Sequence, residues 1–157
     1  MDSSDVIKYI KDALELNRAQ IMHIYELENF NITEDRVNSI LQNKRKSNSA
    51  NATYEELGVF LDGLIFYKRG VQKEPSEEEV ILDNNLIIKK IRVALNLKEF
   101  ELFIIFELAD YKISKSTLKD IFRSPLHPKY KECTNPTLKA FLEGLNEFYF
   151  ENSEELK

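Results

Sequence analysis

The sequence predicts an all-α fold made of two tandem four-helix modules, on three observations. Apolar residues recur at helical spacing through most of the 157 residues. Gly and Pro number only four each, which favours long helices over a succession of tight turns. The chain also matches itself at an offset of 81 residues without an insertion, so that Ala13 falls on Ala94 and Gly63 falls on Gly144. A repeat this long indicates one helical module used twice.

The repeat sets the expected domain boundaries. We expect a first helical repeat over residues 1–69, a linker over residues 70–83, and a second helical repeat over residues 84–157 whose C-terminal tail frays. Pro75 and the acidic run of residues 77–79 predict a solvated, partly extended linker. The two glycines inside the fourth helix of each module, Gly63 and Gly144, predict that another helix approaches closely at these points.

In the first module we expect helices over residues 5–16, residues 18–28, the residues after Thr33, and the residues from Thr53 onwards. Asn29 is a natural stop for the second helix, because Asn tolerates the left-handed conformation. Residues 43–52 are polar and predict an exposed loop. The predicted N-caps, which include two capping boxes, are Ser4 or Asp5, Asn17 with Gln20, Thr33, and Thr53 with Glu56.

The second module repeats this order. Its first helix should be capped by one of residues 83–85, and its third helix should cover residues 115–123 after an N-cap at Ser114. The fourth helix should start near Pro136 and end near Phe150. The second helix, about residues 99–109, is apolar on nearly every side, so we expect it to be covered all round by both modules or by a second copy of the chain.

Charge and composition exclude several function classes. The net charge of −5 excludes a generic binder of polyanions, although residues 1–80 carry −5 and residues 81–150 carry +2. A single cysteine, Cys133, excludes an internal disulfide framework and fits a reducing compartment. The acidic, amphipathic start lacks the pattern of a signal peptide, and no apolar run approaches eighteen residues. We therefore expect a cytoplasmic protein that does not engage membranes.

The sharpest candidate site is a basic stripe on the third helix of the second module. Lys115, Lys119 and Arg123 are spaced four apart, and Lys112 precedes the helix. A short helix, a turn and a polar-basic helix are typical of a helix-turn-helix, whose last helix enters the major groove of DNA. The favoured alternative is a solvated face without a ligand, since the first module has Glu34, Asn38 and Gln42 at the equivalent positions.

A catalytic or metal site has little support in the sequence. His127 and Cys133 lie six residues apart in one connector, and such a pair can form a nucleophile or supply metal ligands. Two ligands do not complete a metal site, however, and His23 is the only other histidine. The connector is better interpreted as structural. We expect no catalytic residues, no metal and no cofactor.

Several segments of the second module resemble those of the YehS-like family of bacterial proteins, which consist of two tandem copies of a domain of unknown function. The segments are NNLIIKKIRVALNL, SKSTLKDIFR, HPKYKEC and LKAFLEGL, and the resemblance extends from about Asp5 to Gly144. The chain departs from the family pattern at Asn29 and Asp110, where glycine is expected, and at Asn135-Pro136. The resemblance implies an all-helical bacterial protein and supplies no activity.

Two function hypotheses follow. The first is a non-enzymatic protein-binding or regulatory module that engages another protein or a second copy of itself, because the helix at residues 99–109 has more apolar surface than one module covers. The alternative is a nucleic-acid binder that uses the basic helix at residues 114–123.

Overall fold

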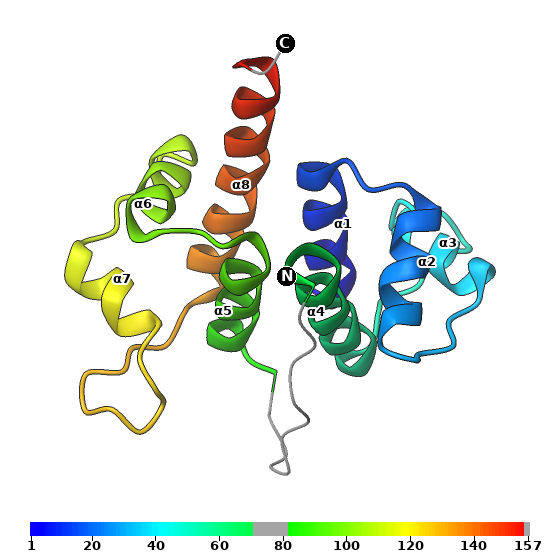
Figure 1. Cartoon of the computed structure of the whole chain (residues 1–157), viewed down its shortest axis with the longest axis horizontal. Coiled ribbons are helices and arrows are strands. Elements are labelled where there is room, and N and C mark those ends of the chain that lie inside the picture. The colour runs from blue at the N-terminus through cyan, green and yellow to red at the C-terminus, as the bar shows by residue number, and fades with distance from the viewer. Residues whose placement is uncertain (71–81, 156–157) are drawn as a thin grey trace. The chain divides into compact units, whose positions relative to one another are not determined.

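The structure, a computed structural model, describes the backbone of residues 1–70 and 82–155 and the side chains of residues 1–70 and 82–150. These residues form eight α-helices and no strand, so the prediction of an all-α fold is confirmed (Figure 1). The chain divides into two compact units, Met1–Ile81 and Leu82–Lys157, and each contains four helices. The predicted linker at residues 70–83 lies largely outside the described residues.

The first unit contains α1 (Ser3–Leu14), α2 (Arg18–Leu27), α3 (Glu34–Leu41) and α4 (Tyr54–Arg69). Within it, α4 packs most extensively on α2 and also contacts α1, while α3 lies against α1 and α2. Gly70 ends α4 in the left-handed conformation, with φ of 67°. The second unit contains α5 (Asn84–Leu95), α6 (Glu99–Leu108), α7 (Lys115–Ile121) and α8 (Asn135–Glu155). There, α8 packs against α6 and α5.

The cores of the two units are the same core built twice. Ten buried apolar residues of the first unit each have a buried apolar counterpart 81 positions later, in the second unit. This is the physical basis of the repeat, because both modules bury one helix face at the same register. The pairs are Ile7 and Ile88, Ile10 and Ile91, Ile21 and Leu102, Ile24 and Ile105, Val37 and Leu118, Ile40 and Ile121, Leu57 and Leu138, Phe60 and Phe141, Leu61 and Leu142, and Leu64 and Leu145.

Side chains cap most helices at the predicted positions. Asn17 and Gln20 form a reciprocal capping box at the start of α2, with both N···O distances at 2.8 Å. The start of α1 differs from the prediction. Its N-cap is Asp2, and Asp5 closes the capping box from the third helical position at 3.2 Å. Neither Ser4 nor Asp5 is the cap, because the helix begins two residues earlier than its apolar stripe indicates.

The second helix of each unit ends in the same left-handed turn. Asn29 and Asp110 have φ of 54° and 52°, and the residue after each donates to a carbonyl five positions back. This pattern is a Schellman motif, which satisfies the last carbonyls of the helix. Asn and Asp are the non-glycine residues that tolerate this conformation best, so glycine is not needed at either position and the predicted stop at Asn29 is confirmed.

Two glycines allow the closest helix contact in each unit. A Cβ atom on Gly63 would overlap the carbonyl oxygen of Ile24, and one on Gly144 would overlap that of Ile105. The backbones of α4 and α8 therefore rest directly on α2 and α6. The close approach predicted from the two intrahelical glycines is confirmed.

Three local predictions need correction. The third helix of the second unit ends at Ile121 and does not reach Arg123. The helix expected to end near Phe150 continues to Glu155. The loop at residues 43–52 is exposed as expected over residues 43–48, but Ser49 and Ala50 are half-buried and Ala52 is only 4% exposed. Its backbone N–H donates to the buried Ser4 hydroxyl, and this bond fixes the loop on α1.

Candidate functional site

The basic segment predicted from the sequence lies on α7 and in the turn before it. Ser114 caps α7 by accepting a hydrogen bond from the Thr117 N–H at 3.1 Å. Lys112, Lys115 and Lys119 are exposed. None of the three has a carboxylate within ion-pair distance among the residues whose side chains are described. Their charges are therefore available to an external anion.

Arg123 is not part of this stripe. It lies beyond the end of α7, and its Nε donates to the Asp120 carboxylate at 2.7 Å. Both side chains are largely covered, with exposures of 23% and 21%. The predicted set of four basic residues is thereby reduced to three. Spacing alone suggested a continuous stripe, because it gave no sign that α7 would stop after seven residues.

The connector after α7 folds back along this helix. The Lys131 N–H donates to the Asp120 carbonyl at 3.1 Å, and Lys131 Nζ lies 3.4 Å from Thr117 Oγ1. His127 Nε2 lies 3.3 Å from Arg123 Nη1. Two further exposed lysines, Lys129 and Lys131, thus belong to the segment that covers α7. The helical spacing could not indicate them, because they are eight and ten residues beyond the end of α7 at Ile121.

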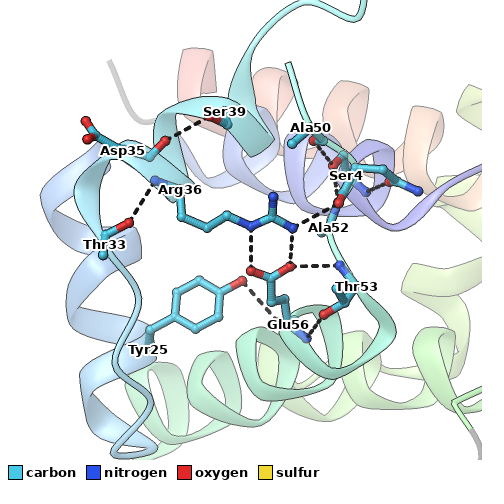
Figure 2. A network of polar contacts seen from close by, with 11 residues as sticks. Ser4, Tyr25, Thr33, Asp35, Arg36, Ser39, Ala50, Ala52, Thr53 and Glu56 are labelled. Atoms are coloured by element: carbon cyan, nitrogen blue, oxygen red, sulfur yellow. Dashed lines mark hydrogen bonds and ion pairs between the residues drawn. The ribbon is translucent and has the colours of Figure 1, made fainter. Parts of the chain in front are cut away.

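The first unit uses the equivalent region for an internal polar network, shown in Figure 2. Arg36 Nε and Nη2 donate to the two carboxylate oxygens of Glu56 at 2.8 and 2.7 Å. Arg36 Nη2 also donates to the Asn51 carbonyl, and the buried Tyr25 hydroxyl donates to the Glu56 carbonyl at 3.0 Å. The Arg36 hydrogen bonds hold the pKa of the Glu56 carboxyl below its ordinary value, against the opposing effect of burial.

The second unit replaces this charged network with a neutral one. Thr117 and Thr137 occupy the positions of Arg36 and Glu56. Thr137 Oγ1 lies 2.6 Å from the Tyr111 hydroxyl and 2.9 Å from Thr134 Oγ1. Among the described side chains, the lysines around α7 have no carboxylate within ion-pair distance, and Asp120 binds Arg123.

The outer face of α6 is exposed and apolar. Phe100 is 62% exposed and Ile104 is 38% exposed, whereas Leu102, Ile105 and Phe106 on the inner face are fully buried. The second unit alone therefore does not cover this helix on every side, and cover by both modules or by a second copy stays a prediction. Phe100, Phe103 and Ile104 form one stripe, because residues three and four apart project from the same side of a helix.

The first unit shows that the fold does not need this apolar stripe. Its equivalents of Phe100, Phe103 and Ile104 are Ala19, Met22 and His23. Ala19 and His23 are exposed, and the helix that carries them packs in the same way. The apolar outer face of α6 is consequently a property of the second unit alone.

A depression of about 580 Å³ adjoins this face at the turn between α6 and α7. Apolar side chains and charged groups line it together. Glu107 and Asp110 are exposed, and neither has an ion-pair partner among the described side chains. The residues that line the depression are Phe103, Phe106, Glu107, Asp110, Tyr111, Lys112, Ile113 and Ser114.

His127 and Cys133 have separate partners. The His127 Nδ1 atom accepts from the Lys129 N–H at 3.0 Å. Cys133 is buried, its Sγ lies 3.8 Å from the Thr134 carbonyl, and burial raises the pKa of its thiol to about 12. Within the described residues, no group of three or more His, Cys, Asp or Glu side chains is placed to hold a metal ion.

Comparison with known proteins decides the family. A family model described as "Protein of unknown function (DUF1456)" matches residues 4–70 and 84–149, which are the two helical units. The chain belongs to this family. The chain is also 28% identical over 147 residues to "Uncharacterized protein YehS" of Escherichia coli (strain K12), covering 92% of this chain and 94% of that protein. The resemblance found in the sequence is confirmed, and no solved structure matches the chain.

Three features of this DUF1456 protein have no signal in helical periodicity. They are the Arg36–Glu56 pair, the exposure of Phe100 and Ile104, and the position of Lys129 and Lys131 against α7. The repeat itself contains a signal for each, because the paired positions differ in charge or hydropathy between the modules.

Among the described helices, none is long and apolar enough to cross a membrane.

Proposed function

We propose that this DUF1456 protein is a non-enzymatic binding module and that the outer face of α6 docks a basic, amphipathic segment of a partner protein. One observation carries the proposal. Phe100 and Ile104 are exposed at positions where the first unit, with the same fold, has Ala19 and His23. An apolar face that the fold does not require is a mark of an interaction surface.

The charge around this face favours a basic partner. Residues 99–110 contain four Asp or Glu and no Lys or Arg. Two of these carboxylates, Glu107 and Asp110, line the depression together with Lys112, so the charged groups of its lining sum to −1. Neither carboxylate has an ion-pair partner among the described side chains. A second copy that paired through its own α6 would place acidic groups against acidic groups, which disfavours self-association at this face.

The size of the stripe suits a helical partner. Phe100 and Ile104 are one turn apart, and an apolar stripe of this kind receives the apolar face of another helix. Burying a Phe or Ile side chain fully contributes about 1.5–3 kcal/mol. The two side chains are already partly covered, so their contribution to binding is smaller. A cationic side chain in the depression would add a charge-assisted contact to Glu107 and Asp110.

A non-enzymatic role is supported by the state of the candidate catalytic groups. The Cys133 thiol is buried, with its pKa raised to about 12, and it is not activated by a base. His127 is engaged by the Lys129 N–H and lies beside Arg123. A nucleophile requires an adjacent base or a lowered pKa. Neither condition is met at this pair.

Site-specific photo-crosslinking in bacterial cells tests the proposal. The crosslinking residue p-benzoylphenylalanine replaces Phe100 in one variant and Tyr54 in the control. Tyr54 is 72% exposed in the first unit, so the control is equally accessible. The expected result is a distinct crosslinked protein for position 100 that is absent for position 54 and absent when Ile104→His is added. Mass spectrometry should place the crosslink in a basic segment of that protein.

Two outcomes contradict the proposal. The absence of a crosslink from position 100, or the same products from positions 100 and 54, would remove the docking face. A crosslink to a second copy of the chain would show that the face binds its own copy and not a basic partner protein. The acidic residues around α6 would then not determine which partner binds.

A second candidate function is nucleic-acid binding through α7. It is favoured by Lys112, Lys115 and Lys119, which are exposed and have no carboxylate partner among the described side chains. Labelled duplex DNA and RNA, titrated at low and near-physiological salt, test it. Binding should weaken as salt rises, because phosphate contacts release counterions. The double variant Lys115→Glu with Lys119→Glu should weaken binding about tenfold or more, and unchanged binding would contradict this function.

A further inference from the structure

We infer that basic residues on both flanks of the exposed side of α7, together called the lysine face, contact the phosphate backbone of nucleic acid without reading its sequence. The lysine face consists of Lys115 and Lys119 on α7 and Lys129 and Lys131 on the connector that follows it. The inference rests on the second candidate function, and it adds the two connector lysines and the mode of recognition to it.

Contacts between the two segments place the connector lysines beside α7. The Lys131 N–H donates to the Asp120 carbonyl at the end of α7, and Lys131 Nζ lies 3.4 Å from the Thr117 hydroxyl. Two residues earlier, the Lys129 N–H donates to His127, whose other ring nitrogen lies 3.3 Å from Arg123. The chain thus follows the last turn of α7 closely, although ten residues separate Lys119 from Lys129 in the sequence.

The local charge is strongly positive. Residues 112–131 contain six Lys or Arg and one Asp, a net charge of +5 in a chain whose net charge is −5. All four lysines of the face are exposed, and none lies within ion-pair distance of a carboxylate in the described part of the chain. Concentrated charge of one sign attracts an oppositely charged macromolecule and speeds its association.

The first unit is an internal control for this charge. Its equivalents of the four lysines are Glu34, Asn38, Asn48 and Ala50. The same helix and connector fold there without any of the four positive charges. The lysines are therefore not required by the fold, and their mutual repulsion is a cost that a bound polyanion would remove.

Two side chains that could read bases, those of Ser114 and Arg123, are already engaged. Ser114 Oγ caps α7 and lies 2.9 Å from Thr117 Oγ1. Arg123, the side chain best suited to a bidentate contact with guanine, binds Asp120 at 2.7 Å. The four lysines have no ion-pair partner among the described side chains, and each is a compact point charge on a flexible chain. Lysine contacts to phosphate fix position and carry no sequence information.

Nucleic acid fits this surface better than an acidic protein does. Lysine is depleted in protein–protein interfaces, whose centres are rich in aromatic and apolar residues. A phosphate backbone instead presents one charge at each nucleotide, which suits several unpaired lysines spread over a helix and a loop. An acidic protein surface is the competing partner, and the test includes a probe for it.

Fluorescence anisotropy with the full chain and a labelled 20-base-pair duplex tests the inference. Affinity is measured at 50 and 200 mM salt for the wild type, for Lys115→Glu with Lys119→Glu, and for Lys129→Glu with Lys131→Glu. Lys68→Glu with Lys89→Glu is the matched control, since it makes the same charge change at exposed positions outside the face that also have no ion-pair partner among the described side chains. Circular dichroism verifies that each variant is folded.

Both lysine-face variants should weaken binding about tenfold or more at 50 mM salt, while the control changes it less than about threefold. Each lysine removed should lower the slope of log affinity against log salt by about one. Duplexes of permuted sequence should bind within about threefold of each other, because only phosphates are contacted.

The outcomes separate the inference from the function on which it rests. If only Lys115→Glu with Lys119→Glu weakens binding, the two-segment face is overturned and nucleic-acid binding by α7 stands. If the wild type fails to bind at 50 mM salt, both are overturned. A preference above tenfold for one sequence overturns backbone-only recognition. Competition by polyglutamate as strong as that by unlabelled DNA of equal charge overturns nucleic acid as the partner.

Discussion

Arg36 and Glu56 form a two-pronged ion pair where α3 meets the first turn of α4, with N···O distances of 2.8 and 2.7 Å. The pair joins two helices of one module. At the equivalent positions of the second module, Thr117 and Thr137 are both neutral. The two copies thus differ at this helix junction, and the second copy lacks both charges. A buried carboxylate without its partner would be costly.

The first prediction concerns the coupling of this pair. Arg36→Thr should lower the free energy of unfolding by about 1–3 kcal/mol, because it leaves the Glu56 carboxylate, which is 11% exposed, without its charged donor. The exposure of the Arg36 side chain, 34%, places the loss below that of a fully buried pair. Urea unfolding followed by circular dichroism measures it.

Adding Glu56→Thr to Arg36→Thr recreates the neutral arrangement of the second module, so the double variant should lose less than the sum of the two single variants. We expect a coupling energy of about 1–2 kcal/mol from the double-mutant cycle. Single-variant losses that simply add would show that the two side chains contribute independently, despite their contact.

The second prediction is a pH dependence that comes from Glu56. Hydrogen bonds from Arg36 hold the folded-state pKa of this carboxyl below its ordinary value of 4.5, although burial acts to raise it. A depressed folded-state pKa means that its stabilisation is fully present above pH 4.5 and is lost as the pH falls through the lower, folded-state value. The difference in unfolding free energy between wild type and Glu56→Gln should therefore shrink as the pH falls from 7 to 3. A difference that stays constant would assign the effect to packing.

Much of the fold follows from the sequence, because each helix must bury one face. Ile24 and Ile105, for example, are 81 positions apart and both fully buried, so one periodic pattern determines both cores. Caps such as Thr33 are local signals and were also predicted. The cap at Asp2 was not, because Asp5, Ser4 and Asp2 are all good caps and only the helical hydrogen bonds identify the first turn.

The surfaces could not be predicted in the same way. The hydropathy of Phe100 predicts burial, because covering its side chain lowers the free energy. Hydropathy does not show whether the same chain provides the residues that cover it. The spacing predicts that Arg123 lies on one stripe with Lys115 and Lys119. In the structure α7 ends before Arg123, and the Arg123 side chain donates to Asp120 instead. The Lys131 N–H donates to the Asp120 carbonyl on α7, and the helical spacing of the sequence does not predict this hydrogen bond from a loop. These features depend on how loops close, which a helical pattern does not contain.

The third prediction is that neither intrahelical glycine accepts a side chain. Gly63→Ala and Gly144→Ala would each press a Cβ atom into a backbone carbonyl, of Ile24 and Ile105 respectively. Alanine gains about 1 kcal/mol of helix propensity at such a site. Overpacking costs about 1–3 kcal/mol or more, and a backbone atom cannot rotate away, so both variants should be destabilised. Thermal unfolding followed by circular dichroism measures the loss.

Gly70→Ala is the comparison for these variants. Gly70 has φ of 67° and no atom within 4 Å of the added Cβ, so only backbone strain of about 1–2 kcal/mol is expected. If Gly63→Ala were more stable than the wild type, α2 and α4 would have to separate easily. The close approach would then not be a constraint on the fold.

The fourth prediction is that the Cys133 thiol is inert in the folded protein. It is 1% exposed, and burial, together with the nearby Asp83 and Glu132 carboxylates, raises its pKa to about 12. The thiolate is the reactive form, and an ordinary thiol has a pKa of about 8.5, so the reactive fraction at pH 8 should be lower by a factor on the order of 1,000. A chromogenic disulfide reagent should label Cys133 only as fast as the chain unfolds, and denaturant should accelerate the reaction.

An Asn48→Cys variant gives the internal reference for this measurement. Asn48 is exposed in the loop of the first unit that corresponds to the connector around Lys129. The variant should show one fast thiol and one slow thiol in the same molecule. Two fast thiols without denaturant would mean that the connector opens from α5 and α7 far more readily than its hydrogen bonds to Asn85 and Asp120 indicate. Lys129 and Lys131 would then move with it, and the lysine face would exist only part of the time.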